Sequence, residues 1–314
     1  TAATGCNGYE ELCDRPLNEV AFATAHNAMS AADAQFTNPN QPRGMVAQLD
    51  AGIRGFLIDA YNGAVGERGR VVTQLTGEIR ESIVDEIGED GLAAVERLVG
   101  NPLTVGAPLP DDATQYLCHV VCEIGATPML EALTEVEAWL DEHPREVIVI
   151  FIQDEGVTPE QVEQVFAEAG LLDLVYEHEP GTPWPTLGEL IDSGPRVVVL
   201  AENVGAPGTW YQQGFDVVQE TPYDNKTVDA LRSDESCVPN RGGTAGDLFL
   251  LNHWVARYPP RPSDARTVNA YDFLLDRARR CEAIRGLMPN LVAVDFYDRG
   301  DLIAVVNELN GLGG

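Results

Sequence analysis

The feature that most constrains this sequence is a recurring alternation of short, β-branched apolar runs with segments of helical periodicity. Such alternation is typical of a parallel sheet whose strands are connected by helices. Eight runs are expected to be strands, at residues 20–24, 55–60, 116–120, 147–153, 172–176, 196–201, 248–252 and 291–296. Because eight parallel strands close a barrel, we predict an α/β fold of the irregular (β/α)8 TIM type.

Helices are expected between the strands, at residues 45–51, 129–143, 159–169, 187–192, 269–285 and 301–310. One hydrophobic core can hold all these segments, so the 314 residues are expected to form a single domain. Two long connections interrupt the alternation, at about 62–114 after the second strand and 203–246 after the sixth. The first includes an acidic helical segment at 78–99, and the second is rich in glycine and aromatic residues. Long connections at a barrel mouth often build the binding site.

The charge balance limits the partners of this chain. It has 20 Lys and Arg against 50 Asp and Glu, a formal net charge of −30. Binding a nucleic-acid backbone needs clustered cations, so nucleic acid is excluded as a partner. The same charge argues against docking on strongly anionic membranes and leaves room only for transient contact with a lipid interface. No run is long and apolar enough for a transmembrane helix, and no leader opens the chain, so we expect that a signal peptide has been removed. We expect a monomer.

Six cysteines fall into three local pairs, which favours disulfides and an exported protein. A zinc site at Cys118, His119 and Cys122 is an alternative, but the other cysteines lack the spacing of a structural zinc site. The expected pairs are Cys6 with Cys13, Cys118 with Cys122, and Cys237 with Cys281.

Polar residues stand at the carboxyl ends of most expected strands, which is where β/α barrels carry their functional side chains. Two histidines from separate strands at one mouth meet the needs of a general base and a general acid. Each of these residues taken alone could be a hydrogen-bonded structural residue, but their coincidence favours an active site. They are His26, Asn27, Asp59, His119, Gln153, Asp154, Glu155, Glu202, Asn203, Asn252, His253 and Asp295.

Several of these positions lie in recognisable motifs. Residues 22–30, FATAHNAMS, resemble the first-strand signature of the phosphatidylinositol-specific phospholipase C X-domain superfamily, and residues 48–59, QLDAGIRGFLID, resemble its second strand. The resemblance continues in order through residues 117–119, 139–144, 146–153 and 294–297, while the two long connections match nothing in it. The cysteine pattern and residues 12–20 look most like the secreted bacterial and plant branch.

The resemblance implies roles for three residues. His26 would act as the base that draws a proton from the inositol 2-hydroxyl, and His119 as the acid that protonates the departing diacylglycerol oxygen. The residues alone would permit the reverse assignment. Asp295 would accept from the ring N–H of His26 and orient it, although it could instead cap the final helix.

The resemblance also implies a divalent cation, which we expect to be Ca²⁺. Asn27 and Asp59 match oxygen ligands of the calcium-dependent members, but Leu57 and Gln153 stand where those members have glutamates. Calcium-independent bacterial members have an arginine at the position of Asp59, and no arginine fills that role here. Further ligands are expected among Gln153, Asp154, Glu155 and Glu202.

Substrate contacts are expected from polar and aromatic residues near the mouth. Arg54 matches a family arginine, yet strand alternation puts it on the face opposite Asp59, which favours a structural ion pair. The aromatic residues could form the wall that receives an inositol ring, a choline group or a lipid, or could simply pack in the core. The remaining candidates are Asn203, Trp210, Tyr211, His253, Trp254 and Tyr258.

Together these features predict a secreted phosphodiesterase of the phosphatidylinositol-specific phospholipase C type, acting on a phospholipid or a glycerophosphodiester. One alternative is phospholipase D-type cleavage that releases choline or ethanolamine, and another is an inactive lipid-binding barrel. The net charge of −30 repels an anionic diester unless a cation intervenes. It therefore favours zwitterionic or soluble esters over polyphosphorylated inositides.

Overall fold

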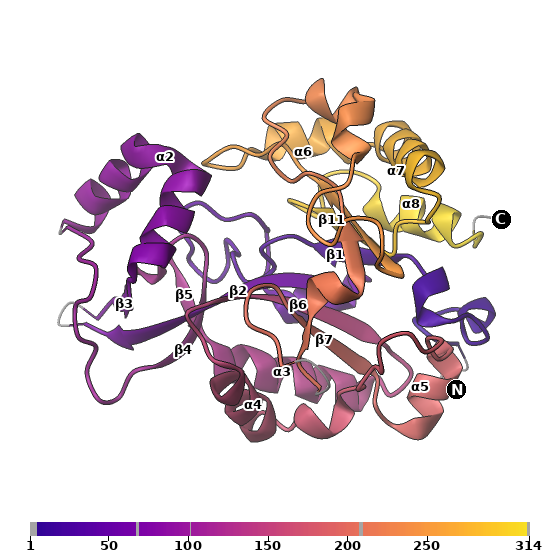
Figure 1. Cartoon of the computed structure of the whole chain (residues 1–314), viewed down its shortest axis with the longest axis horizontal. Helices are drawn as coiled ribbons and strands as arrows, with labels where there is room; N and C mark the ends of the chain where they lie inside the picture. The colour runs from indigo at the N-terminus through magenta and orange to yellow at the C-terminus, as the bar shows by residue number, and fades with distance from the viewer. Residues whose placement is uncertain (1–4, 67–68, 101, 207–209, 313–314) are drawn as a thin grey trace.

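The computed structural model describes residues 5–66, 69–100, 102–206 and 210–312. Eight strands form one curled parallel sheet in the order β8-β7-β6-β2-β1-β11-β10-β9 (Figure 1). They are β1 (Phe22–Ala25), β2 (Gly55–Val65), β6 (Ile148–Glu155), β7 (Val197–Ala201), β8 (Gln212–Gln213), β9 (Val218–Glu220), β10 (Leu248–His253) and β11 (Leu291–Val294). The end strands β8 and β9 follow one another in the chain through the 3-10 helix η5 (Gly214–Asp216). This is the irregular α/β barrel that the alternation predicts.

Two of the eight predicted strands do not lie in the parallel sheet. The run at 116–120 forms β4 (Thr114–Cys118), which pairs antiparallel with the outer half of β2 and with β5 (Ala126–Pro128). The run at 172–176 contains the 3-10 helix η4 (Leu172–Leu174). Their places in the sheet are taken by β8 and β9, which lie in the second long connection. An apolar run does not encode the direction of its strand, and strands of two or three residues are too short to show periodicity.

Helices cover the sheet on two sides (Figure 1). They are α1 (Met45–Asp50), α3 (Met129–Glu142), α4 (Pro159–Glu168), α5 (Leu187–Ser193), α6 (Pro262–Val268), α7 (Tyr271–Arg285) and α8 (Leu302–Leu309). The start of α4 shows why the sequence folds this way, because Thr158 accepts from the Gln161 backbone and Pro159 occupies the first turn. Helix α6 was not predicted, and the helix expected from residue 269 starts at Tyr271.

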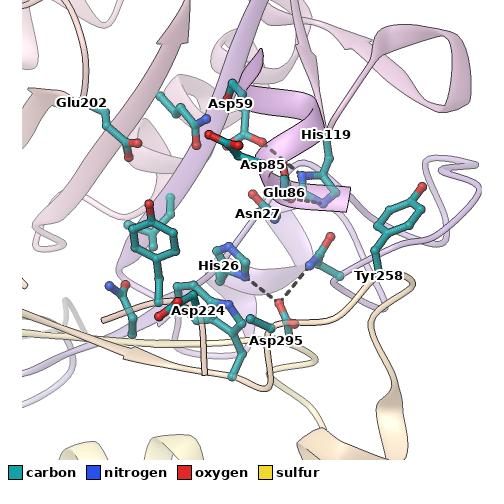
Figure 2. A pocket seen from close by; sticks show the side chains of 18 of the residues that line it. His26, Asn27, Asp59, Asp85, Glu86, His119, Glu202, Asp224, Tyr258 and Asp295 are labelled. Atoms are coloured by element: carbon teal, nitrogen blue, oxygen red, sulfur yellow. Dashed lines mark hydrogen bonds and ion pairs between the residues drawn. The ribbon is translucent and has the colours of Figure 1, made fainter. Parts of the chain in front are cut away.

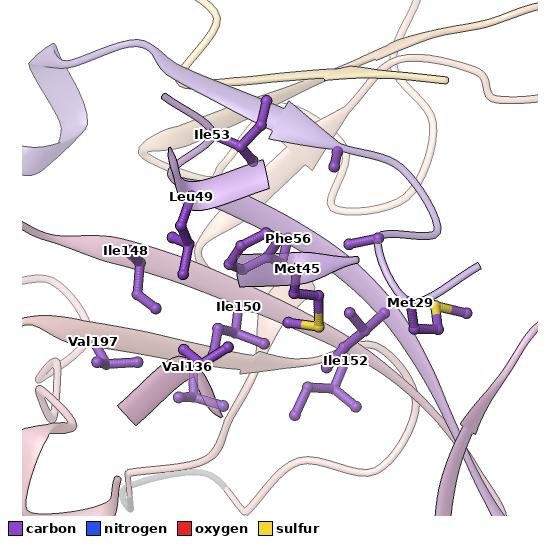
Figure 3. Packing of buried hydrophobic residues seen from close by; sticks show 14 of the residues in the cluster. Met29, Met45, Leu49, Ile53, Phe56, Val136, Ile148, Ile150, Ile152 and Val197 are labelled. Atoms are coloured by element: carbon purple, nitrogen blue, oxygen red, sulfur yellow. The ribbon is translucent and has the colours of Figure 1, made fainter. Parts of the chain in front are cut away.

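Alternate residues of each parallel strand face opposite sides of the sheet, which decides which side chains can reach the cavity. Phe56 of β2 and Ile150 of β6 pack toward the helices, with Leu49 of α1 and Val136 of α3 (Figure 3). The intervening strand residues form a second cluster that fills the inside of the curled sheet. That cluster includes Phe22, Leu57, Phe151, Leu200, Leu250 and Ala293.

The first long connection forms a separate layer beside the barrel mouth. Strands β3 (Val71–Thr73) and β4 pair with the outer half of β2, and helix α2 (Gly77–Val99) packs its apolar face on them. That face carries Ile79, Ile83, Leu92 and Val95. Gly88 interrupts α2 with φ 75° and ψ 165°, a conformation that favours glycine. Figure 1 shows α2 apart from the helices that cover the sheet.

All three predicted disulfides are present: Cys6–Cys13, Cys118–Cys122 and Cys237–Cys281. Because Cys118 and Cys122 are bonded to each other, neither offers a thiolate to zinc, and the zinc alternative is wrong. Among the residues that the structure describes, no helix is long and apolar enough to cross a membrane.

Candidate active site

A cavity of about 860 Å³ lies at the carboxyl ends of the barrel strands. Twelve residues that the sequence singled out line it. Close to one another are His26, Asn27, Asp59, His119 and Asp295 (Figure 2); the others are Gln153, Glu155, Glu202, Asn203, Asn252, Trp254 and Tyr258. His26 and Asn27 directly follow β1, Asp59 lies in β2, and Asp295 directly follows β11. These three strands are neighbours in the sheet, so their polar ends converge.

The His26 ring is held on two sides. Its Nδ1 lies 2.8 Å from Asp295 Oδ1, and Asn40 donates to the same carboxylate oxygen at 3.0 Å. Trp254 stacks on the ring with a centroid distance of 3.6 Å and an interplanar angle of 5°. Asp295 therefore accepts the Nδ1 proton and leaves Nε2 on the side of the cavity, as a base requires.

His119 reaches the cavity from the antiparallel strand β4 rather than from a barrel strand. Leu117 lies opposite Ala60 of β2, so the next residues along β4 come level with Asp59. Val120, directly after His119, has φ 68°, a conformation that β-branched residues rarely adopt. The Cys118–Cys122 disulfide closes a short loop that contains these two residues. The side chain is therefore placed by a short, covalently closed turn.

Both ring nitrogens of His119 face carboxylates. Nδ1 lies 3.2 Å from Asp59 Oδ2, and Nε2 lies 3.3 Å from Glu86 Oε1 of α2 (Figure 2). Burial disfavours the charged ring, but Glu86 and the hydrogen bond to Asp59 outweigh it and raise the pKa of His119 to about 9. His119 thus holds a proton at neutral pH, which suits the acid.

Asn27 links the two histidines. Its φ of 47° is left-handed, which asparagine tolerates better than most residues. With its amide nitrogen facing Asp59, it donates to both carboxylate oxygens at 3.2 Å. Its amide oxygen accepts from His119 Nδ1 and, once His26 Nε2 has taken a proton, from that nitrogen as well, each at 3.2 Å. One amide therefore bridges both rings and Asp59.

The opposite side of the cavity is organised around Arg241. Its guanidinium pairs with Glu202 and with the fully buried Glu220, and lies 4.7 Å from the centroid of the Tyr223 ring. Burial raises the pKa of Glu202 to about 7, even though Arg241 opposes the shift. Asn203, next to Glu202 in the chain, also lines the cavity. This half offers polar groups to a substrate away from the histidines.

Most side chains expected to hold a divalent cation contact other groups of the protein. Asp154 accepts from the backbone N–H groups of Asn203 and Val204, and Glu202 pairs with Arg241. Gln153 donates to Glu155, and Asp59 contacts His119. Within the described ranges, no three His, Cys, Asp or Glu side chains are grouped to hold one ion.

Strand alternation moves two predicted residues away from the cavity. Asp154 faces away while its neighbours Gln153 and Glu155 line the cavity, and His253 faces away while Asn252 and Trp254 line it. His253 is fully buried, with Nε2 2.9 Å from the Val268 carbonyl oxygen. Burial, helped by Arg277, lowers the pKa of His253 to about 3, so the ring is neutral.

Three more substrate-binding candidates lie elsewhere. Trp210 and Tyr211 are buried in the cluster between the sheet and the helices, where Trp210 packs on Phe166. Arg54 pairs with Glu146 at 2.7 Å, the structural ion pair that alternation favours. The structure brings none of the three to the cavity.

Several cavity residues were missed by the sequence reasoning: Asn40, Glu86, Tyr223, Lys226 and Arg241. Most come from the long connections, where neither strand ends nor motifs gave a signal. Lys226 is the only lysine in the chain, and the sequence did not mark it as functional. The lining is strongly acidic, with Lys226, Arg241 and Arg257 as its basic residues. Its carboxylates are Asp59, Glu78, Glu81, Asp85, Glu86, Glu155, Glu202, Asp224 and Asp295.

Comparison with known proteins gives a consistent result. The PI-PLC X family model matches residues 105–310. A PI-PLC X domain-containing protein of the fungus Arthroderma benhamiae is 25% identical over 98% of this chain and 90% of its own length. A PI-PLC X domain-containing protein of Arabidopsis thaliana is 24% identical over 94% of this chain and 63% of its own length. Another protein of the same fungus, 25% identical over 95% of this chain and 61% of its own length, is named an uncharacterized secreted protein.

The fold is similar to a solved enzyme structure. A mutant phosphatidylinositol-specific phospholipase C from Staphylococcus aureus superposes with a TM-score of 0.51 and 12% identity. The match covers 96% of this chain and 95% of the bacterial chain. At this identity the likeness concerns the fold alone.

Proposed function

Because this chain belongs to the PI-PLC X family, we propose that it is a phosphodiesterase that cleaves a phospholipid or a glycerophosphodiester at His26 and His119. One observation carries the proposal: two imidazoles line one cavity, and each contacts its own carboxylate. Such a pair can take a proton from one oxygen while it delivers a proton to another.

In a reaction of the phosphatidylinositol-specific phospholipase C type, a hydroxyl of the head group is the nucleophile. His26 Nε2 takes its proton while the oxygen attacks phosphorus, because Asp295 keeps the other ring proton on Nδ1. His119 gives a proton to the glycerol oxygen as its bond to phosphorus breaks. The products are a cyclic phosphodiester and a diacylglycerol, and the two histidines have exchanged protonation states.

A second candidate is phospholipase D-type cleavage of an ester with a cationic head group. The observation that favours it is the excess of carboxylates over basic residues in the cavity lining. A choline or ethanolamine group would be attracted to that lining, whereas a purely anionic ester would be repelled. Water would then replace the head-group hydroxyl as the nucleophile.

Product analysis distinguishes the two candidates. We expect the protein to release an inositol phosphate from phosphatidylinositol, identified by mass, and to release nothing from lysophosphatidylcholine or glycerophosphocholine. Free choline or ethanolamine would refute the first candidate and support the second. No product from any of these esters would support the inactive lipid-binding barrel.

The raised pKa of His119 gives a pH dependence. Only the protonated ring can act as the acid, so we expect kcat/KM to fall as pH rises through about 9. Asp59→Asn removes a carboxylate that holds this proton, and it should move the alkaline limb to lower pH. A pH–rate profile from pH 6 to 10.5 on both proteins checks this. An alkaline limb at the same pH in both would contradict the assignment.

Export and a divalent cation complete the proposal. Three disulfides and the relative named as secreted support an extracellular protein. A cation at Asn27 and Asp59 stays a prediction of the resemblance. Assays of EDTA-dialysed protein with and without added Ca²⁺ test it, because a cation-dependent site loses turnover in EDTA and regains it with Ca²⁺.

A further inference from the structure

The first long connection places a carboxylate on the nitrogen of His119 that the proposed reaction needs. Asp59 occupies Nδ1, so the proton for the leaving oxygen must come from Nε2. Glu86 Oε1 lies 3.3 Å from that Nε2. The leaving oxygen of a bound diester and the Glu86 carboxylate would therefore require the same N–H.

The surroundings of Glu86 differ from those of the other groups at His119. The side chains of His119 and Asp59 are each 7% exposed, whereas that of Glu86 is 43% exposed. A half-exposed carboxylate can turn into water without losing its solvation, which a buried one cannot. Of the two carboxylates, Glu86 is the one that can be displaced.

The geometry of α2 allows such a displacement without unpacking the barrel. The face of α2 that carries Glu86 lines the cavity, while its apolar face packs on β3 and β4. Gly88 breaks the helix two residues beyond Glu86. Glu86 thus lies in the last turn before the kink of α2. Figure 2 shows Glu86 next to His119.

We propose that Glu86 is an internal competitor of the substrate, which occupies the proton-donating nitrogen of His119 in the free protein and is displaced by the phosphate group. A phosphodiester at His119 brings its own negative charge close to Glu86, so both cannot stay at Nε2. Glu86 lies on α2, in the first long connection. The inference rests on the proposed role of His119 as the acid.

Binding of inorganic phosphate tests this without depending on turnover. By titration calorimetry at pH 6, below the ordinary pKa of histidine, we expect Glu86→Gln to bind phosphate roughly five-fold more tightly than the wild type. Such a gain corresponds to the removal of one half-exposed ion pair. A KM for the diester that falls by a similar factor would add support.

Two matched variants separate this contact from general charge effects. Glu89→Gln removes one negative charge from the same helix, where Glu89 pairs with Arg80 outside the cavity. Glu81→Gln removes one negative charge from the cavity wall at another position of α2. Both variants should bind phosphate with a Kd within two-fold of the wild-type value. Unchanged or weaker binding by Glu86→Gln, or an equal gain in Glu81→Gln, would overturn the inference. Absence of turnover with tighter phosphate binding would overturn the proposed function alone.

Discussion

Replacing His119 with alanine is expected to lower kcat for the diester by about 10²- to 10⁴-fold, the contribution typical of a general acid. The same loss is expected for His26→Ala, because the base and the acid serve opposite ends of one displacement. The measurement is product release by each variant under saturating substrate. KM should change less than kcat, since both rings act mainly while the bonds to phosphorus form and break.

A matched control is His143→Ala. His143 stacks on Trp139 beyond the end of α3 and does not line the cavity. We expect wild-type kcat in this variant, and the melting temperatures of all three variants should show that the barrel is folded. If both His26→Ala and His119→Ala turned over substrate at the wild-type rate, these histidines would not be the catalytic pair.

Asp295→Asn is expected to cause the second large loss, roughly 10³- to 10⁴-fold in kcat, with little change in KM. The carboxylate accepts from Nδ1 of His26 at 2.8 Å and so leaves Nε2 without a proton. An asparagine at this position can donate to Nδ1 instead, which moves the ring proton to Nε2. The ring would still stack on Trp254, but it could no longer take a proton from a hydroxyl.

Asp298→Asn serves as the control for this variant. Asp298 is three residues further along the same segment, pairs with Arg299, and is outside the cavity lining. It should retain full turnover and phosphate affinity. An Asp295→Asn variant that keeps wild-type kcat would show that Asp295 only caps or packs, and that His26 is oriented by other groups.

The part of the site on parallel strands could be predicted from the sequence. His26, Asp59 and Asp295 each come at or directly after an apolar run of a central strand, and the carboxyl ends of such strands meet at one edge. His119 was placed at the correct mouth for a partly wrong reason. It arrives on β4, which runs antiparallel to β2, and a sequence pattern does not show strand direction.

Two other predictions placed a side chain on the wrong face of its strand, an error of one residue in the count along the strand. His253 and Asp154 were chosen because they end strands, but each faces the helices while its neighbours face the cavity. A strict two-residue count from Phe151 or Leu250, which face inward, would have corrected both. Glu86 could not be found this way. It lies on a helix of the inserted layer, whose position relative to the barrel depends on tertiary packing alone.

The lone lysine at the rim of the cavity makes this protein unusually simple to label. Apart from the amino terminus of the chain, an amine-selective reagent has one primary amine to react with, and that amine is on an exposed residue that lines the cavity. A dye attached at Lys226 would lie at the edge of the cavity. Its emission would then report ligand entry directly, in a sample that needs no engineered cysteine and keeps all three disulfides intact.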